Sequence, residues 1–272
     1  RANINLSVFN STIISLSNET KKKKSNNRFT SEHLEKIKTI HQESRESYGS
    51  PRIHVELKAQ GENCSRKRVA RLMKQENISV KARRKKVITT LRSKTCERVA
   101  PNILDQRFNV KAPNHYWASD ITYVNTLEGW LYVSVVMDLF SRKIVGLSMG
   151  KSLHTDLVMK SFLQALFRRK PKKGLLHHSD RGSQYTSNRF QELAAEYGVE
   201  LSMSAKGYCY DNAVVESFFH TLKGELTDRY QYRSREEATQ SIFEYIEVFY
   251  NRKRRHSTLE YLSPYNFEEK FD

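Results

Sequence analysis

The order of apolar segments in this sequence predicts an α/β fold, in which a mixed five-stranded sheet is flanked by helices and preceded by a small all-helical domain. Between residues 113 and 225, short β-branched segments alternate with segments that repeat every three to four residues. Between residues 31 and 80, only the helical period is present. Lysine and arginine are concentrated in this same N-terminal part of the chain. The three observations together predict two domains of different class.

The first thirty residues carry no clear periodicity. The run Lys21–Lys24, followed by Ser-Asn-Asn, predicts a linker or a poorly structured segment over residues 1–30. Residues 5–16 are moderately apolar but lack the basic region and cleavage signal of a secretory peptide. The chain starts at Arg1 instead of Met, which suggests a fragment, a processed product or the tail of a longer fused reading frame.

Residues 31–80 predict a helix-turn-helix domain. Pro51 is placed to open a second helix, and Ser65 to cap a third helix whose buried stripe includes Val69 and Leu72. Two short helices joined by a Gly-containing turn are typical of a helix-turn-helix, although a three-helix bundle that binds no DNA has the same pattern. The basic residues of the third helix are expected to contact DNA, and they are Arg66, Lys67, Arg68, Arg71 and Lys74.

The distribution of charge favours DNA binding by this part of the chain. Residues 1–112 contain 26 Lys and Arg against 10 Asp and Glu, whereas residues 113–272 contain 21 against 20. Such an imbalance is expected of a module that binds a polyanion, and a solvated basic surface is the alternative. Residues 81–112 are interpreted as a basic linker that follows the DNA backbone. Its expected contacts include Arg83, Arg84, Lys85 and Lys86.

The composition argues against several other classes of protein. Cys64, Cys96 and Cys209 are widely separated, which disfavours a disulfide framework or a cysteine-based zinc site and suits a reducing cytoplasm. The sequence has no run of about 18 apolar residues, so no membrane-spanning segment is predicted. With 38% hydrophobic and 11% aromatic residues, the chain can bury a core.

The α/β core is predicted to begin near Asn114. Its first three strands are expected over His115–Val124, Leu131–Leu139 and Arg142–Met149, the last two being joined by a short turn. Thr155 is expected to cap the helix that follows.

The second half of the core continues with alternating strands and helices. A short buried strand is expected over Gly174–His178, a helix from Ser187, a last strand over Val199–Met203 and a third helix from about Asp211. Residues 226–272 are interpreted as a helical extension.

Three acidic residues occupy notable positions in this core. Asp120 lies in the first strand, Asp180 follows the fourth and Glu216 lies in the third helix. A chain with 30 Asp and Glu contains some such spacing by chance, so the flanking residues matter. Three adjacent carboxylates repel one another, and a pair of divalent cations such as magnesium or manganese removes that cost. Two such ions can assist both the attacking and the leaving oxygen in phosphodiester chemistry.

The residues around these carboxylates resemble the catalytic core of DDE transposases and retroviral-type integrases, which have an RNase H-like fold. The similar segments are Trp117–Thr122, His178–Tyr185, Tyr210–Phe219 and Tyr250–Pro264. The resemblance runs from about Tyr48 to Pro264, and it is closest to the downstream-frame transposase of bacterial insertion sequences with two overlapping frames. It implies an RNase H-like core over residues 113–225 that performs metal-dependent DNA strand cleavage and strand transfer, in DNA integration and recombination.

The resemblance also implies roles for individual residues. Asp120, Asp180 and Glu216 are expected to be catalytic and to bind two Mg²⁺ or Mn²⁺ ions. Further contacts to DNA are expected from Gln184, Tyr185, Asn212, Lys223, Arg254 and His256. Lys223 follows Glu216 by seven residues, about 10 Å along a helix, which suits contact with a phosphate beside the metal site. Tyr208 departs from the Asn or Asp that is more usual in the family.

The resemblance implies that the chain binds double-stranded DNA, both the terminal inverted repeats of the element and the target. It also implies that several copies of the chain assemble on that DNA. Whether the product of an upstream frame takes part is left open. The implied location is the bacterial cytoplasm, on the nucleoid. Two other functions stay open: a non-catalytic DNA-binding regulator derived from a transposase, which the presence of all three carboxylates disfavours, and a nuclease of the same fold.

Several residues admit a structural interpretation instead. His177 and His178 lack a matching Cys or His spacing, so a structural or DNA-facing role is favoured over a metal site. Asp138 ends a strand and is expected to cap the following turn, and Trp117 is expected in the core. The basic cluster Arg252–Arg255 follows an amphipathic helix and is consistent either with DNA contact or with a solvated helix end.

Overall fold

The computed structural model describes residues 31–80, 99–105, 110–205 and 212–271. The chain divides into two compact units, Arg1–Lys81 and Ala82–Asp272. The predictions for residues 1–30, for Tyr208 and for the linker residues Arg83, Arg84, Lys85 and Lys86 lie outside the described residues.

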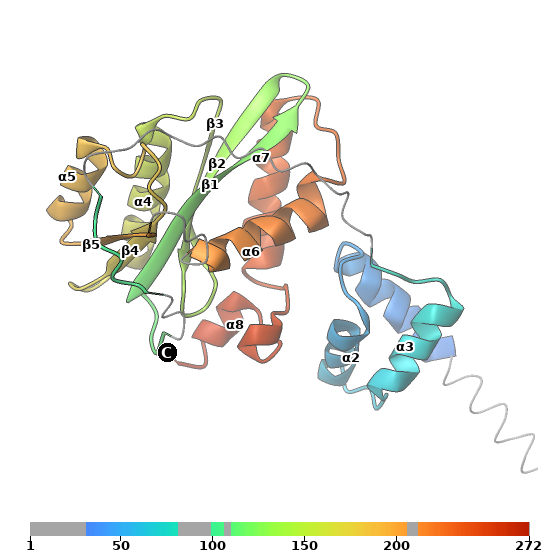
Figure 1. Ribbon diagram of the computed structural model, residues 1–272. Coiled ribbons are helices and arrows are strands. Elements are labelled where there is room, and N and C mark those ends of the chain that lie inside the picture. The colour runs from blue at the N-terminus through green and yellow to red at the C-terminus, as the bar shows by residue number, and fades with distance from the viewer. Residues whose placement is uncertain (1–30, 81–98, 106–109, 206–211, 272) are drawn as a thin grey trace, which may run out of the picture. The chain divides into compact units, whose positions relative to one another are not determined.

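The N-terminal unit consists of three helices in the part that is described. The first covers residues 31–43, α2 covers Ser50–Ala59 and α3 covers Arg66–Gln75 (Figure 1). Their shared core includes Ile37, Ile53, Leu57 and Val69, which are all fully buried. The Ser65 hydroxyl accepts a hydrogen bond from the backbone N–H of Arg68 at 3.3 Å, which confirms the predicted N-cap.

The C-terminal unit contains a five-stranded mixed sheet with the strand order β3-β2-β1-β4-β5. The strands are β1 (Tyr116–Thr126), β2 (Gly129–Asp138), β3 (Ile144–Gly150), β4 (Leu176–Ser179) and β5 (Glu200–Met203). β1, β2 and β3 form an antiparallel meander, whereas β4 pairs in parallel with β1 and β5 in parallel with β4. The predicted mixed sheet and its order of strands and helices are therefore confirmed.

Helices cover both faces of this sheet (Figure 1). In Figure 1, α4 and α5 lie on one face and α6 and α7 on the other. The helices are α4 (Thr155–Arg169), α5 (Asn188–Glu196), α6 (Ala213–Leu222), α7 (Arg235–Glu244), α8 (Pro264–Glu268) and the short 3₁₀ helix η4 (Ser257–Leu259). Two π-helical segments, η2 (Lys223–Thr227) and η3 (Tyr245–Tyr250), continue α6 and α7 directly. The predicted cap at Thr155 is wrong, because His154 is the N-cap and Thr155 begins the helix.

The main core lies between the sheet and the helices α4 and α5. It contains Trp117 of β1, Val136 of β2, Phe162 of α4 and Phe190 of α5, all fully buried. The prediction that Trp117 is a core residue is therefore confirmed. Each such side chain contributes about 1.5–3 kcal/mol of hydrophobic stabilisation, so this layer fixes the sheet that carries Asp120 and Asp180.

A buried polar cluster closes the end of β2. The Asp138 carboxylate accepts hydrogen bonds from the backbone N–H groups of Asn114 at 2.7 Å and Phe140 at 3.0 Å, which confirms the predicted cap. Arg169 lies 3.5 Å from Asp138 and donates to both oxygens of Glu268 in α8, each at 2.9 Å. This ion-paired cluster joins the last helix of the chain to the sheet.

In the described part of the chain, no helix is long and apolar enough to cross a membrane.

Replacement of Gly146 with alanine tests the contact between β3 and α4. A Cβ at Gly146 would lie 2.1 Å from the Ser161 carbonyl oxygen and 3.0 Å from the Ala165 Cβ, so the strand and the helix must separate. We expect Gly146→Ala to lower the free energy of unfolding by at least about 1–3 kcal/mol in urea.

Gly150→Ala is the matched control on the same strand. There the nearest side-chain atom would be at 3.4 Å, an ordinary contact distance. Equal urea midpoints for the two variants would contradict this close packing.

Candidate active site

The parallel pairing of β1 with β4 brings the two aspartates to equivalent positions. Ala118 of β1 pairs with His178 of β4, and Asp120 and Asp180 each stand two residues further along their segments. Neighbouring strands lie about 4.8 Å apart, so this register places the two carboxyl groups on neighbouring segments of the same sheet edge.

The environment of Asp120 is unfavourable for a negative charge. Its carboxylate accepts a hydrogen bond from the backbone N–H of Ile121 at 2.8 Å. Loss of hydration, together with the charges of Asp180 and Glu216, nevertheless raises the Asp120 pKa to about 8, and the nearby Lys223 offsets this only in part. Asp120 therefore retains its proton at neutral pH unless a metal cation binds beside it.

The pKa values of Asp180 and Glu216 are also raised. Asp180 follows β4 directly and accepts a hydrogen bond from the Gly182 backbone N–H at 3.0 Å, and partial loss of hydration raises its pKa. Glu216 stands in the first turn of α6, where desolvation and then the charge of Asp180 raise its pKa. The fold thus brings all three predicted carboxylates within electrostatic reach of one another.

Lys223 lies beside these carboxylates. It begins η2, and its Nζ atom is 5.1 Å from the centre of the Tyr123 ring. Its charge lowers the pKa of Asp120, so the ammonium group is near the acidic cluster. This location agrees with the orientation that the spacing of Glu216 and Lys223 predicts.

The donor chemistry of the cluster fits hard divalent cations, because carboxylate oxygens are their preferred ligands. Among the described residues, no three His, Cys, Asp or Glu side chains converge closely enough to hold one ion by themselves. Magnesium commonly takes only one or two carboxylates and completes its shell with water and substrate phosphates. The arrangement therefore suits an ion site that is open to substrate, and not a closed protein cage.

His177 and His178 belong to the structural support of this site. The Nε2 atom of His177 is 2.6 Å from the Ser119 hydroxyl, and burial lowers its pKa to about 3. The Nδ1 atom of His178 is 2.9 Å from the Ser202 hydroxyl of β5. Both side chains are fully buried and hydrogen-bonded between strands, which favours the structural interpretation.

The other residues predicted near the carboxylates differ in their exposure and position. Gln184 stays beside Asp180, since a Cβ at Gly182 would lie 3.0 Å from the Asp180 Oδ1 and 3.1 Å from the Gln184 Oε1. Tyr185 is only 1% exposed and Asn212 4% exposed. The protein covers both side chains in this structure, and their direct contact with DNA stays a prediction.

Asn212 acts instead as a link between α6 and the sheet. Its Nδ2 atom donates a hydrogen bond to the backbone carbonyl of Ser119 at 3.2 Å, next to Asp120 in β1. Since Asn212 is the N-cap of α6, this bond fixes the start of the helix, which lies three residues ahead of Glu216. Asn212 therefore has a structural contact beside Asp120.

Arg254 is paired inside the protein, and its contact with DNA stays a prediction. Arg254 is 4% exposed, and its Nε and Nη2 atoms donate to the two carboxylate oxygens of Glu225 at 2.8 and 2.6 Å. The Tyr245 hydroxyl donates to the same carboxylate at 2.7 Å. His256 is half-buried and joins this network, with its ring 4.8 Å from that of Tyr250. The sequence did not single out Glu225, because nothing in its local pattern marks a buried acid.

The basic residues of α3 remain available for DNA. Arg66, Lys67, Arg71 and Lys74 are exposed, and Arg68 is half-buried.

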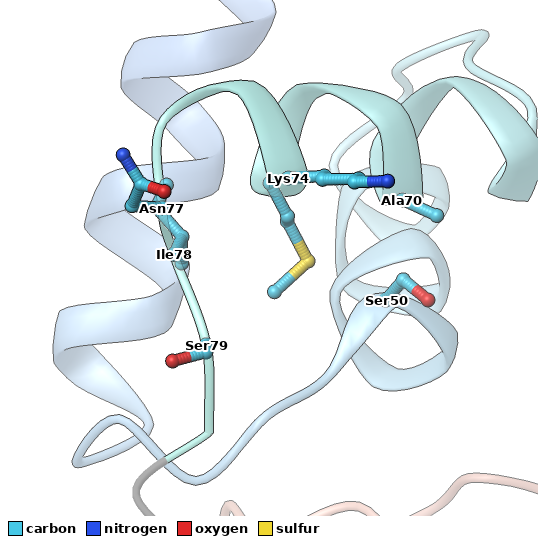
Figure 2. Close-up of a pocket in the computed structure, with 7 residues that line it drawn as sticks. Ser50, Ala70, Lys74, Asn77, Ile78 and Ser79 are labelled. Carbon is cyan, nitrogen blue, oxygen red and sulfur yellow. The ribbon is translucent and has the colours of Figure 1, made fainter.

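A pocket of about 530 Å³ lies where the end of α3 meets the start of α2, and Figure 2 shows Lys74 along one side of it. It is lined by Ser50, Ala70, Met73, Lys74, Asn77, Ile78 and Ser79. This lining contains one cationic side chain and no cluster of titratable groups, so it indicates no chemistry of its own.

Comparisons with known proteins agree with this architecture. The HTH-like domain family matches residues 30–86, and two integrase core domain families match residues 110–209 and 197–264. The chain is 46% identical over 235 residues to the transposase for insertion sequence element IS904 of Lactococcus lactis, covering 86% of this chain and 92% of that protein. It is 44% identical over 227 residues to transposase InsF of IS3A from Escherichia coli, covering 84% and 78%.

A protein of insertion element IS600 from Shigella sonnei, described as an uncharacterized 31 kDa protein, is 45% identical over 235 residues, which is 86% of each chain. Among solved structures, the magnesium complex of the HTLV-2 integrase catalytic core domain in its trimeric form has a TM-score of 0.46 and 19% sequence identity, and the match covers 58% of this chain and 97% of that chain.

The ion pair between Arg254 and Glu225 gives a prediction about stability. Arg254→Met leaves the largely covered Glu225 carboxylate, whose side chain is 11% exposed, without its cation, which costs up to about 3–5 kcal/mol. We expect a matching fall in the free energy of unfolding in urea. The double variant Arg254→Met with Glu225→Gln should recover most of the loss, because no buried charge remains.

A role of Arg254 in DNA binding predicts a different pattern. In that case Arg254→Met would reduce DNA affinity and the salt dependence of binding while the urea midpoint stayed constant. That outcome would contradict the structural assignment.

Proposed function

Since the chain belongs to the insertion-sequence transposases that combine an HTH-like domain with an integrase core domain, we propose that it cleaves and joins DNA strands at a two-metal site formed by Asp120, Asp180 and Glu216. The protein is a transposase of the polynucleotidyl-transferase type. The proposal concerns the residues and ions that carry out this activity.

The observation that carries the proposal is the mutual effect of the three carboxylates. Asp120 has a pKa of about 8 because desolvation and the charges of Asp180 and Glu216 oppose its ionisation. A fold gains no stability from carboxylates that repel one another in a partly dehydrated site. Perturbed groups of this kind are typical of functional sites, and divalent cations relieve the repulsion.

In this mechanism, two bound Mg²⁺ or Mn²⁺ ions would activate the attacking oxygen and stabilise the leaving oxygen of a phosphodiester. Asp120 and Asp180 are held by the paired strands β1 and β4, and Glu216 by α6. Lys223 contacts a phosphate next to the scissile bond. Water attacks first at the end of the element, and the exposed 3′-hydroxyl then attacks the target strand, so no covalent protein–DNA intermediate is required.

Recognition of the element ends is assigned to the basic surface of α3, which exposes Arg66, Lys67, Arg71 and Lys74. Exposed cations on the second helix of a helix-turn-helix suit both base edges and phosphates. Gln184 is retained as a contact near the carboxylates because it lies beside Asp180. Assembly of several copies on DNA is part of the same proposal.

A direct assay uses a labelled element end and a supercoiled target plasmid with Mg²⁺. The proposed function requires both cleaved and joined products. Binding without cleavage would support a DNA-binding regulator, and cleavage without joining would support a nuclease of the same fold.

Replacement of Asp120 by asparagine should separate activity from stability. Asp120→Asn removes a metal ligand, so strand cleavage should fall below a few per cent of the wild-type rate. Between the ordinary aspartate pKa of 3.8 and the folded-state pKa of about 8, the folded wild type holds a proton that the unfolded chain releases. Its stability therefore falls as the pH rises through this range, whereas that of Asp120→Asn should not show this fall.

Thermal unfolding from pH 5 to about 9 without divalent ions measures this difference. Asp156→Asn is the control, because Asp156 is an exposed carboxylate paired with Arg189 at 2.9 Å, and such surface pairs contribute little. Two results would count against the site. One is cleavage by Asp120→Asn at the wild-type rate, and the other is the same pH dependence of stability in Asp120→Asn and the wild type.

Lys223→Ala tests the proposed phosphate contact. Loss of one phosphate contact should reduce the slope of log affinity against log salt by about one unit, equally on every DNA sequence. Strand joining should fall further than binding, because phosphoryl transfer depends on positioning.

Lys173→Ala is the control, since Lys173 is an exposed lysine that precedes the start of β4, whereas Asp180 follows its end. An unchanged salt slope in Lys223→Ala, or a loss confined to particular sequences, would place Lys223 elsewhere.

A further inference from the structure

The hairpin of β1 and β2 carries two exposed aromatic side chains close to the carboxylates. Tyr123 is 40% exposed and Trp130 is 48% exposed. Their rings are in contact, with centroids 5.0 Å apart and planes at 82°. Single exposed aromatics are common on protein surfaces, but a contacting pair beside an active site provides an extended apolar surface for a flat ligand.

Tyr123 follows Asp120 by three residues in β1, which corresponds to about 10 Å along the strand at 3.4 Å per residue. Side chains three residues apart leave a strand on opposite faces. Lys223 connects the two positions, because its ammonium group lies 5.1 Å from the Tyr123 ring centre and lowers the pKa of Asp120. The aromatic pair therefore adjoins the carboxylates through Lys223.

A positive charge adjoins this aromatic pair at Tyr123. The Lys223 ammonium lies 5.1 Å from the Tyr123 ring centre. Arg235 of α7 contacts the backbone at the other ring, where its Nε donates to the Trp130 carbonyl at 2.9 Å, and its guanidinium is 3.9 Å from the Glu128 carboxylate. An aromatic pair with a cation beside it suits nucleotides, whose bases stack and whose phosphates are anionic.

The hairpin is held rigidly by the segment that precedes and opens α7. The Leu127 backbone N–H donates to the Tyr232 carbonyl at 3.0 Å, and the Arg235 backbone N–H donates to the Glu128 carboxylate at 3.0 Å. Gly129 has φ +106°, and a Cβ there would lie 2.9 Å from the Arg235 Nη2. A binding surface on fixed strands loses little entropy when it engages a ligand.

We propose that Tyr123 and Trp130 bind an unpaired base of the DNA strand whose phosphate is held at the carboxylates. Inside a duplex each base is stacked on both faces, so only a base that has left the stack can lie against these rings. Aromatic stacking accepts any base, which suits a site that acts beside different target sequences. The inference rests on the proposed function, because it takes the carboxylates as the position of the reacting phosphate.

Fluorescent DNA tests the inference on the full chain without divalent ions. The probes are two duplexes with 2-aminopurine near one end, one fully paired and one with mismatches around the 2-aminopurine. Wild type and Tyr123→Phe, which keeps the ring, should bind the mismatched probe more tightly and quench its fluorescence. Tyr123→Ala and Trp130→Ala should lose this quenching, with roughly 5- to 150-fold weaker binding of the mismatched probe.

Two features distinguish this site from a general DNA contact. The salt slope should stay unchanged in Trp130→Ala, since no phosphate contact is lost. Phe243→Ala is the matched control, because Phe243 in α7 is also 48% exposed, and it should behave as wild type on both probes.

Three results would overturn the inference. One is quenching by Tyr123→Ala and Trp130→Ala equal to that of Phe243→Ala. Another is that Tyr123→Ala and Trp130→Ala lose affinity equally for the paired and the mismatched probe. The third is a change in the solution mass of Trp130→Ala with quenching intact, which would make the surface a contact between copies of the chain.

Strand cleavage with Mg²⁺ is measured separately, on a mismatched probe that carries the element end. Quenching by the wild type without cleavage would reject the proposed two-metal function, whereas cleavage that depends on Asp120 without quenching would reject the base site alone.

Discussion

The parallel pairing of β1 with β4 is the constraint on which the rest of the catalytic unit depends. Ala118 pairs with His178, and Asp120 and Asp180 each follow their member of this pair by two residues, so the two aspartates lie side by side. Burial of Asp120, together with the repulsion that results, raises its pKa to about 8, so the sheet must be stabilised elsewhere. The buried layer around Trp117 and the histidine hydrogen bonds between strands supply that stability.

The third carboxylate depends on contacts at both ends of its helix. Asn212 fixes the start of α6 to the backbone of Ser119. At the other end, Glu225 in the π-helical continuation is paired with Arg254 from the C-terminal extension. π-Helical turns are frequent at functional sites, and this one lies between Lys223 and Thr227. The extension therefore belongs to the support of the site and is not an appendage to it.

Sequence patterns predicted much of this arrangement because each relevant signal is local. Alternating segments and caps such as Ser65 identified the elements, and the phrases around Asp120, Asp180 and Glu216 identified the candidate site. The burial of Tyr185, Asn212 and Arg254 was not predicted, because burial depends on tertiary neighbours that a local phrase does not specify. A basic cluster after an amphipathic helix looks the same whether an arginine meets DNA or a buried glutamate. The pair of Tyr123 and Trp130 was missed because it forms only across the register of two strands.

The central claim is that three separately encoded carboxylates act together as a divalent-cation site. Calorimetric titration of the metal-free protein with Mn²⁺, in two buffers of different ionisation enthalpy, tests it most directly. The account predicts that Mn²⁺ binds with release of protons below the Asp120 pKa of about 8, and that Asp180→Asn greatly weakens this binding. Binding of equal strength in the wild type and Asp180→Asn, or binding without proton release, would contradict it.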